Sequence, residues 1–203
     1  MVRVLFALFI FFSVTLAQAE EVVLGMSQNE VAITATFDGS NILVFGAIKR
    51  DSPIPNTPLH VIISIAGPSK PVVVRRKEQR FGIWVNKDTV EVDAAPSFYA
   101  IATTGSFQEV LSETEDLRHK VSINRAIRSV GAPMDVSNAQ SFSDALIRIR
   151  REQGLYQSLE GTVALDQQTL FLTTIKMPAN LTEGEYRTRI FLTREGKVCL
   201  LYT

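Results

Sequence analysis

The stretch that decides the fold is Pro178-Ala179-Asn180-Leu181-Thr182-Glu183-Gly184-Glu185-Tyr186, which leads into Arg187-Thr188-Arg189-Ile190-Phe191-Leu192. Proline and glycine together predict a corner in the chain at this point. The side chains of Leu181 and Tyr186 are expected to pack beneath that corner. The pattern of polar and apolar residues beyond Tyr186 then predicts a strand over 187–193.

Segments of the same kind lie on both sides of this corner. Asp38-Gly39-Ser40-Asn41 has the composition of a hairpin turn, and 52–58 is a proline-rich loop that cannot donate to a sheet. The runs between such turns predict short strands over 31–37, 42–48, 60–65, 72–75, 80–85, 89–92 and 98–103, and later over 159–165, 169–175 and 198–202. This spacing predicts a mainly β chain, and a late strand entered through a corner is typical of an immunoglobulin-like β-sandwich.

The spacing of apolar residues changes to a helical period between 106 and 154. The residues expected to face the core are Leu117, Val121, Ile127 and Val130 on one helix, and Phe142, Leu146 and Ile149 on another. Gly131 with Pro133 is expected to end the first long helix, and Gly154 the second. We therefore expect an insertion of two or three helices over 106–154, which divides the sandwich into 20–105 and 155–203.

Residues 1–19 have the features of a signal peptide. Arg3 supplies a positive charge, an apolar run over 4–17 follows it, and Ala17-Gln18-Ala19 is a small-residue cleavage site. The run is shorter than the roughly twenty residues that a membrane span needs. No cysteine follows it to accept a lipid. The protein is therefore expected to be exported to the periplasm, with an uncleaved anchor as the alternative.

Charge and cysteine content narrow the function classes. The chain has 21 lysines and arginines against 21 aspartates and glutamates, so no global positive field attracts nucleic acid. Cys199 is the only cysteine, which means that no internal disulfide can form and that stability depends on burial. Cys199 is expected to be a small buried residue, and a bridge between chains is the alternative. The oligomeric state is left open.

Metal and cofactor motifs are missing from the sequence. His60 and His119 are the only histidines, and no HExxH or cysteine cluster accompanies them. Met26, Met134 and Met177 are scattered singly, which favours core filling over copper binding. Neither GxGxxG nor GxxxxGK[ST] occurs. We therefore expect no metal and no cofactor.

Catalytic motifs are missing as well. Glu109, Glu113 and Asp116, with Glu115 beside them, are spaced to form a solvated acidic stripe on a helix. No GxSxG elbow or SxxK pair supports nucleophilic hydrolysis. The sequence therefore assigns no catalytic residue and predicts that the protein is not an enzyme.

Basic residues gather in the helical insertion and form the predicted membrane or partner surface. They are Arg118, Lys120, Arg125, Arg128, Arg148, Arg150 and Arg151. Each cation held near anionic headgroups contributes about 1 kcal/mol, so several together can hold a domain at a membrane. The residue pattern by itself favours a solvated helix face, and the membrane or partner surface is its functional interpretation. A second basic run, Arg75-Arg76-Lys77 with Arg80, lies between predicted strands.

Trp84 and Tyr99 are the remaining candidates for binding. The two aromatic side chains could form a ligand-binding surface, but the strand patterns around both favour packing in the core or against a sheet.

Five fold-bearing segments are 21–27, 42–48, 81–86, 96–99 and 184–192. They resemble an alphaproteobacterial family of uncharacterised proteins, known as putative transmembrane proteins. The resemblance implies a signal peptide, a periplasmic domain and usually one C-terminal membrane helix. Only residues 197–203 follow Gly196. At about 3.3 Å per residue, this segment is too short to cross a membrane. We expect either a soluble member or a chain that stops before its anchor.

These observations together predict a non-enzymatic accessory or interaction domain in the periplasm, associated with the inner membrane. Its expected partner is an integral membrane protein or the membrane surface. One alternative is a small-ligand or metal-binding module, in which Met26, His60 and His119 would have to converge. A further alternative is a hydrolase without a recognisable motif.

Overall fold

A computed structural model describes residues 20–27, 37–50, 53–127 and 140–203. Three sequence-based predictions therefore lie outside the described residues. They are the signal peptide over 1–19, all but the last residue of the strand over 31–37, and the helix end at Gly131 and Pro133. Among the basic residues of the insertion, Arg128 also lies outside the described part of the chain.

One sheet is formed by the early strands and a later pair. Its order is β1-β2-β9-β8, and every neighbouring pair is antiparallel. The strands are β1 (Glu20–Met26), β2 (Gly39–Arg50), β8 (Ala164–Asp166) and β9 (Leu170–Pro178). Buried and exposed residues alternate along all of β9, as expected for a sheet with one face on the core. We call this sheet the first sheet.

The second sheet has the order β11-β10-β3-β6-β7. Its strands are β3 (His60–Ala66), β6 (Tyr99–Thr103), β7 (Tyr156–Leu159), β10 (Arg187–Arg194) and β11 (Lys197–Tyr202). The pair β6–β7 is parallel, while the other pairs are antiparallel. A parallel pair requires a long crossover, and the helices that the structure describes lie in that connection.

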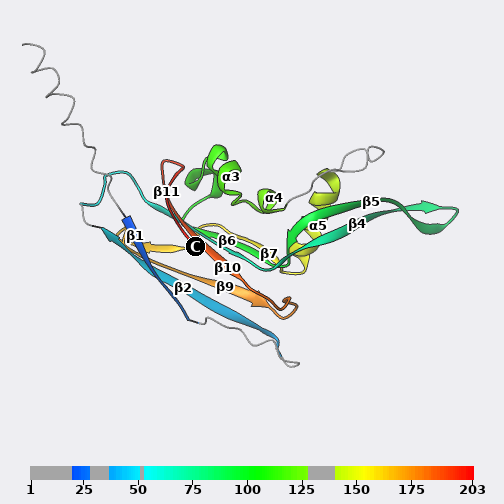
Figure 1. The fold of residues 1–203 in the computed structure, drawn as a ribbon, viewed down its shortest axis with the longest axis horizontal. Coiled ribbons are helices and arrows are strands. Elements are labelled where there is room, and N and C mark those ends of the chain that lie inside the picture. Colours follow the sequence, from blue (N-terminus) through cyan, green and yellow to red (C-terminus); the bar gives the residue numbers. More distant parts are fainter. Residues whose placement is uncertain (1–19, 28–36, 51–52, 128–139) are drawn as a thin grey trace, which may run out of the picture.

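The two sheets face each other across one hydrophobic core (Figure 1). Val44 and Ile175 on the first sheet and Ile63 and Ile190 on the second are all fully buried. Ile63 and Ile190 are directly opposite each other in the β3–β10 ladder. The chain is therefore mainly β, as the sequence predicts.

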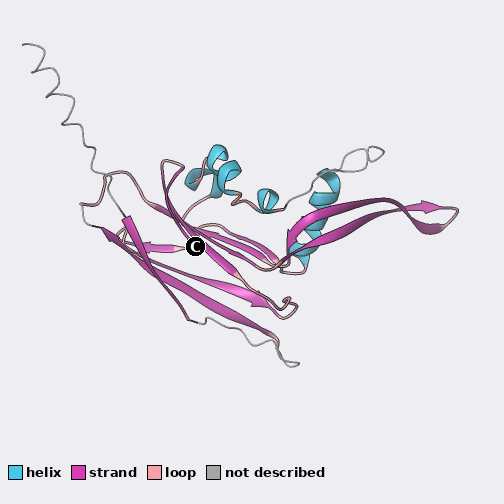
Figure 2. Cartoon of the chain, in the orientation of Figure 1, coloured by secondary structure: helices cyan, strands magenta, loops and turns pink. Residues whose placement is uncertain are grey.

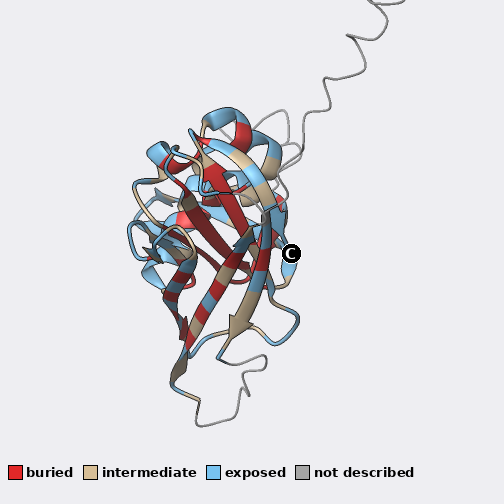
Figure 3. Ribbon diagram, turned by 90° about the vertical axis from the view of Figure 1, so that its left-hand side faces the viewer, coloured by how far each residue is buried: buried red, intermediate tan, exposed pale blue. Residues whose placement is uncertain are grey.

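Helices cover the other face of the second sheet (Figure 2). They are α2 (Phe107–Val110), α3 (Glu113–His119), α4 (Ile123–Ala126) and α5 (Gln140–Glu152). The His119 ring packs edge-on against Phe191 of β10, with 5.8 Å between ring centroids. The Thr193 hydroxyl donates to the Val110 carbonyl at 2.7 Å. Because both faces of the second sheet are covered, every residue of β6 is buried. Figure 3 shows long buried stretches, in red, along strands in the interior of the protein.

The predicted long helix through Leu117, Val121 and Ile127 is wrong. The chain leaves α3 at Lys120, which adopts a left-handed conformation with φ of 51°. One carboxylate oxygen of Asp116 then accepts from the backbone N–H groups of Val121 and Ser122, at 3.0 and 2.7 Å. This turn separates α3 from α4, and Leu117 is exposed as a result.

Strands β4 (Ser69–Arg80) and β5 (Ile83–Pro96) form a long hairpin of their own. The sequence predicts three short strands here, but pairing continues from Ser69–Pro96 to Arg80–Ile83 with two register shifts. Hydrogen bonds from Gly67 N to Phe98 O and from Ser97 N to Pro68 O join this ladder to the β3–β6 pair. The hairpin therefore prolongs β3 and β6 beyond the body of the protein (Figure 1).

The corner before β10 is confirmed. The Tyr186 hydroxyl donates to the carbonyl of Thr182 at 2.7 Å. Its ring lies 6.1 Å from that of Phe98, and Leu181 packs against the core cluster. Burial of the phenol raises its pKa above the ordinary tyrosine value.

Candidate interaction surfaces

The basic residues of the insertion are spread over separate elements. Arg118 lies on α3 and pairs with Glu115 at 2.6 Å, while Lys120 ends that helix. Arg125 lies on α4, and Arg148, Arg150 and Arg151 lie on α5. Figure 1 places α3 and α5 over different parts of the second sheet. Their role at a membrane or partner stays a prediction.

The acidic residues expected to form one helix stripe lie on two separate helices. Glu109 lies on α2, whereas Glu113 and Asp116 lie on α3, which begins after its N-cap Ser112. Glu115 is buried, and its carboxylate contacts Arg118, the His119 ring at 3.4 Å and the Val198 backbone N–H at 3.4 Å. These contacts dock α3 onto β11. The carboxylate of Asp116 accepts hydrogen bonds from the backbone N–H groups of the turn that follows α3.

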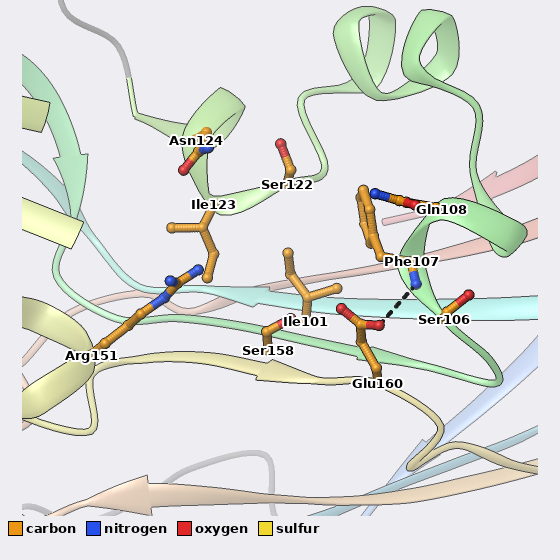
Figure 4. A pocket seen from close by; sticks show the side chains of 10 residues that line it. All are labelled: Ile101, Ser106, Phe107, Gln108, Ser122, Ile123, Asn124, Arg151, Ser158 and Glu160. Carbon is orange, nitrogen blue, oxygen red and sulfur yellow. Dashed lines mark hydrogen bonds between the residues drawn. The ribbon is translucent and has the colours of Figure 1, made fainter. Parts of the chain in front are cut away.

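A cavity of about 540 Å³ lies between α2, α4, α5 and the second sheet (Figure 4). Arg151 and Glu160 stand on opposite sides of it. Glu160 accepts a hydrogen bond from the backbone N–H of Phe107 at 3.1 Å, so its carboxylate caps the start of α2. Ser106, Ser122 and Ser158 also line the cavity, but no histidine does. The lining among the described residues therefore offers hydroxyl groups without an imidazole base.

A wider groove of about 1620 Å³ runs past the start of β10. Met26 and His119 both line it, as does Met177, but His60 does not. The Nδ1 atom of His60 instead hydrogen-bonds with the Thr104 hydroxyl at 3.1 Å. Within the part of the chain that the structure describes, no three His, Cys, Asp or Glu residues gather as a metal site.

Arg189 forms the polar centre of this groove. Its guanidinium donates to the carbonyls of His119 and Lys120, at 2.8 and 3.1 Å, and to the Tyr99 hydroxyl at 3.1 Å. Tyr99 in turn donates to the Val121 carbonyl at 2.9 Å. Burial raises the pKa of the Tyr99 phenol, against the opposing effect of Arg189. The arrangement fastens the turn after α3 to the second sheet.

The packing predicted for Trp84 is wrong, whereas that for Tyr99 is confirmed. Tyr99 is 1% exposed in the core, but Trp84 is 65% exposed near the end of the β4–β5 hairpin. A strand pattern does not distinguish a residue that faces the core from one on a hairpin beyond it. The predicted burial of Cys199 is also wrong, because β11 lies at the edge of its sheet and leaves this side chain exposed.

The end of the hairpin carries a group of exposed apolar side chains, which we call the tip. It consists of Phe81, Ile83, Trp84 and Val85. Phe81 and Gly82 form the connecting turn, with φ of 49° and 82°. The sequence indicated the basic run before the tip but gave no sign that the apolar residues would be exposed.

A second apolar surface lies on the outer face of the first sheet. Val23, Phe45, Leu170 and Leu172 are each between 43% and 57% exposed. In the ladders, Phe45 is opposite both Gly25 and Leu172, and Ala47 is opposite both Val23 and Leu170. The side chains therefore form two neighbouring rows across β1, β2 and β9. We call this surface the outer face.

Comparison with known proteins gives a family match. A model of the family described as Putative transmembrane protein (Alph_Pro_TM) matches residues 21–201. No curated protein and no solved structure matches the chain.

Among the described residues, no helix is long and apolar enough to cross a bilayer.

Proposed function

The chain belongs to the family described as Putative transmembrane protein (Alph_Pro_TM), and we propose that it is an exported accessory domain that binds an integral protein of the inner membrane. In this proposal the protein acts in the periplasm, and its function is to bind a partner rather than to catalyse a reaction. The family description names no activity, so the proposal depends on the surfaces of the domain.

The outer face is the observation that carries the proposal. Soluble monomers rarely expose large contiguous apolar patches. Where such patches occur, they mark contact sites. The Phe45 ring lies so close to Gly25 that a Cβ there would fall 2.5 Å from its Cε2 atom. The glycine thus leaves room for the ring to lie flat on the sheet. The resulting surface is apolar, which suits contact with another protein.

Polar residues surround this apolar centre. Lys49 and Glu21 form an exposed ion pair at 3.5 Å, and Lys176 and Asp166 are exposed on the neighbouring strands. An apolar centre with a polar rim is the usual anatomy of a protein–protein interface. Because neither sheet nor helix covers this face among the described residues, we assign the partner contact to it.

Site-specific photocrosslinking in cells tests the proposal. A photoreactive residue at position 172 is expected to form an adduct with one integral membrane protein, whereas the same residue at Glu152 on α5 is not. Phe45→Ser is expected to weaken the adduct at position 172. Equal adducts at both positions, or no adduct at position 172, would contradict the proposal.

We further infer that the two sheets form an immunoglobulin-like sandwich. The order β1-β2-β9-β8 corresponds to the A-B-E-D order of such folds, and β11-β10-β3 corresponds to G-F-C. Tyr186 has the position and the backbone hydrogen bond of a tyrosine corner, since it directly precedes β10. In this interpretation the helices and the long hairpin are insertions between the C and D strands.

A ligand-binding module is a second candidate, favoured by the wide groove. Met26, Met177 and His119 line it together, so thioether and imidazole groups share one space. Titration of the exported protein with Cu(I) tests this candidate. Stoichiometric binding that His119→Ala abolishes and His60→Ala leaves unchanged would favour it over the accessory domain.

A further inference from the structure

The β4–β5 hairpin divides into a packed base and a free distal half. At the base, Val90 and Val92 are buried, and the Arg76 guanidinium lies over the Phe142 ring of α5 at 5.1 Å from its centroid. Beyond Arg76 the strands pair only with each other, and their residues are mostly exposed. The distal half, residues 77–87, therefore stands in solvent without contributing to the core (Figure 1).

The turn at its end is built against local preference. Positive φ at two successive residues is the signature of a type I′ hairpin turn, for which Asn-Gly is the favoured sequence. Here the first residue is Phe81, a bulky side chain in a conformation that such residues rarely adopt. Its ring is fully exposed, so it gains no packing in return. Strain of this kind at an exposed position points to a function for the side chain.

The other tip residues extend the apolar surface. Ile83 and Trp84 are each about two-thirds exposed, and Val85 follows them on the same strand. Because consecutive strand residues point to opposite faces, these side chains lie on both sides of the end of a two-stranded arm, which suits a soft medium into which the whole tip inserts. A tryptophan beside aliphatic residues is typical of segments at the boundary between lipid headgroups and acyl chains.

Cationic residues lie along the hairpin between the tip and the body of the protein. Residues 75–89 contain five lysines and arginines but only Glu78 and Asp88 as acids. Asp88 is paired with Arg76, and Glu78 with Lys87 at 3.2 Å and Arg80 at 3.4 Å. Arg75 and Lys77 are exposed and have no ion pair among the described residues. The positive charge of Arg75 and Lys77 therefore complements an anionic surface that meets the tip.

We propose that the tip inserts into the headgroup region of an anionic phospholipid bilayer, while Lys77 and, further along the arm, Arg75 attract the anionic lipid surface. The inference rests on the proposed location of the domain at the inner membrane, but it does not depend on the protein partner at the outer face. It assigns lipid to the hairpin and protein to the first sheet.

Trp84 makes the test direct, because it is the only tryptophan in the chain. The protein purified after export is mixed with vesicles of phosphatidylcholine containing 30% phosphatidylglycerol, and with vesicles of phosphatidylcholine alone. With the anionic vesicles we expect a blue shift of the tryptophan emission, quenching by lipids brominated along their acyl chains, and co-sedimentation that salt weakens. An unshifted spectrum with anionic vesicles, or equal binding to both compositions, would overturn the proposal.

Two variants and a control separate the contributions. Phe81→Asn gives the preferred turn sequence, so the hairpin is expected to fold while vesicle binding weakens at least tenfold. Lys77→Gln with Arg75→Gln is expected to reduce the dependence on anionic lipid and on salt. Ile54→Asn removes an exposed apolar residue outside the hairpin and is expected to leave binding unchanged. Equal loss in Ile54→Asn, or full binding in Phe81→Asn, would count against a specific role for the tip.

The photocrosslinking experiment on the outer face distinguishes failure of this inference from failure of the proposed function. A crosslink at position 172 without vesicle binding would leave the protein partner in place and remove the lipid contact. An adduct between a photoreactive residue at position 81 and a protein would assign the tip to a protein instead.

Discussion

Arg189 donates from its Nη2 atom to the hydroxyl oxygen of Tyr99, 3.1 Å away, and thereby joins β10 to β6 across the intervening strand β3. The same guanidinium holds two carbonyls at the end of α3. The Arg189 side chain thus connects the second sheet to the helical layer.

Replacing Arg189 with methionine is expected to lower the free energy of unfolding by about 2 kcal/mol, because several oxygens lose a charged donor. Tyr99→Phe removes both the hydrogen bond to the Val121 carbonyl and the oxygen that accepts from Arg189, and is expected to cost about 1 to 2 kcal/mol. Urea denaturation measures both, and the double variant should show that the two effects are coupled. Arg187→Met, at an exposed position on the same strand, serves as the control and should change stability by less than about 0.5 kcal/mol.

Tyr156 is expected to make the protein sensitive to alkaline pH. Burial raises the pKa of its phenol to about 12, above the value of 10.0 for an ordinary tyrosine. The folded state therefore holds the proton more tightly than the unfolded state. Its contribution to stability is complete below pH 10 and is lost as the pH rises toward 12.

The comparison of wild type with Tyr156→Phe isolates this effect. At pH 8 the variant should be less stable by about 1 kcal/mol, since it loses the 2.7 Å hydrogen bond to the Pro96 carbonyl. Between pH 10 and 12 the difference should shrink or change sign. A constant difference over this range would contradict the raised pKa.

Gly184 is expected to be necessary for the corner before β10. Its φ of 145° is one that other residues rarely adopt, and an added Cβ would lie 2.9 Å from the Pro68 side chain. Gly184→Ala should therefore cost about 2 kcal/mol in thermal or urea unfolding. Gly161→Ala meets no atom within 4 Å and tests backbone strain alone. If both variants lose the same stability, the contact with Pro68 is unimportant.

Phe81→Asn should leave the protein at least as stable as wild type, and the gain should be about 0.5 to 1 kcal/mol. The physical reason is that asparagine tolerates positive φ, whereas the exposed phenylalanine ring contacts nothing that would offset its strain. Differential scanning calorimetry measures the change. A loss of more than 1 kcal/mol would mean that the ring contributes to folding.

Local signals in the sequence predicted local structure well. The corner before β10 could be predicted because Leu181, Gly184 and Tyr186, which form it, lie within a few residues of one another in the sequence. The alternation in β9 and the switch to a helical period likewise follow from neighbours along the chain. These features are enough to predict a mainly β protein and the position of its last strands.

Features that depend on distant contacts could not be read in this way. Leu117 fits a helical apolar face, but Glu115 is the residue that docks α3, because its partner Val198 comes from the end of the chain. Trp84 fits a strand, but its side chain is exposed because the hairpin extends beyond the body of the protein. The outer face was missed for the same reason, since its rows combine strands separated by more than a hundred residues.

The long hairpin also affects how strongly the domain would be retained at a surface. From Arg75 to Phe81 the arm extends about 20 Å at roughly 3.3 Å per residue, so the tip and the outer face are separate sites on one chain. When a first site is occupied, the second binds at a raised effective concentration. Two contacts that are individually weak can then act together as one tight, bivalent attachment, and loss of either one would release the whole domain.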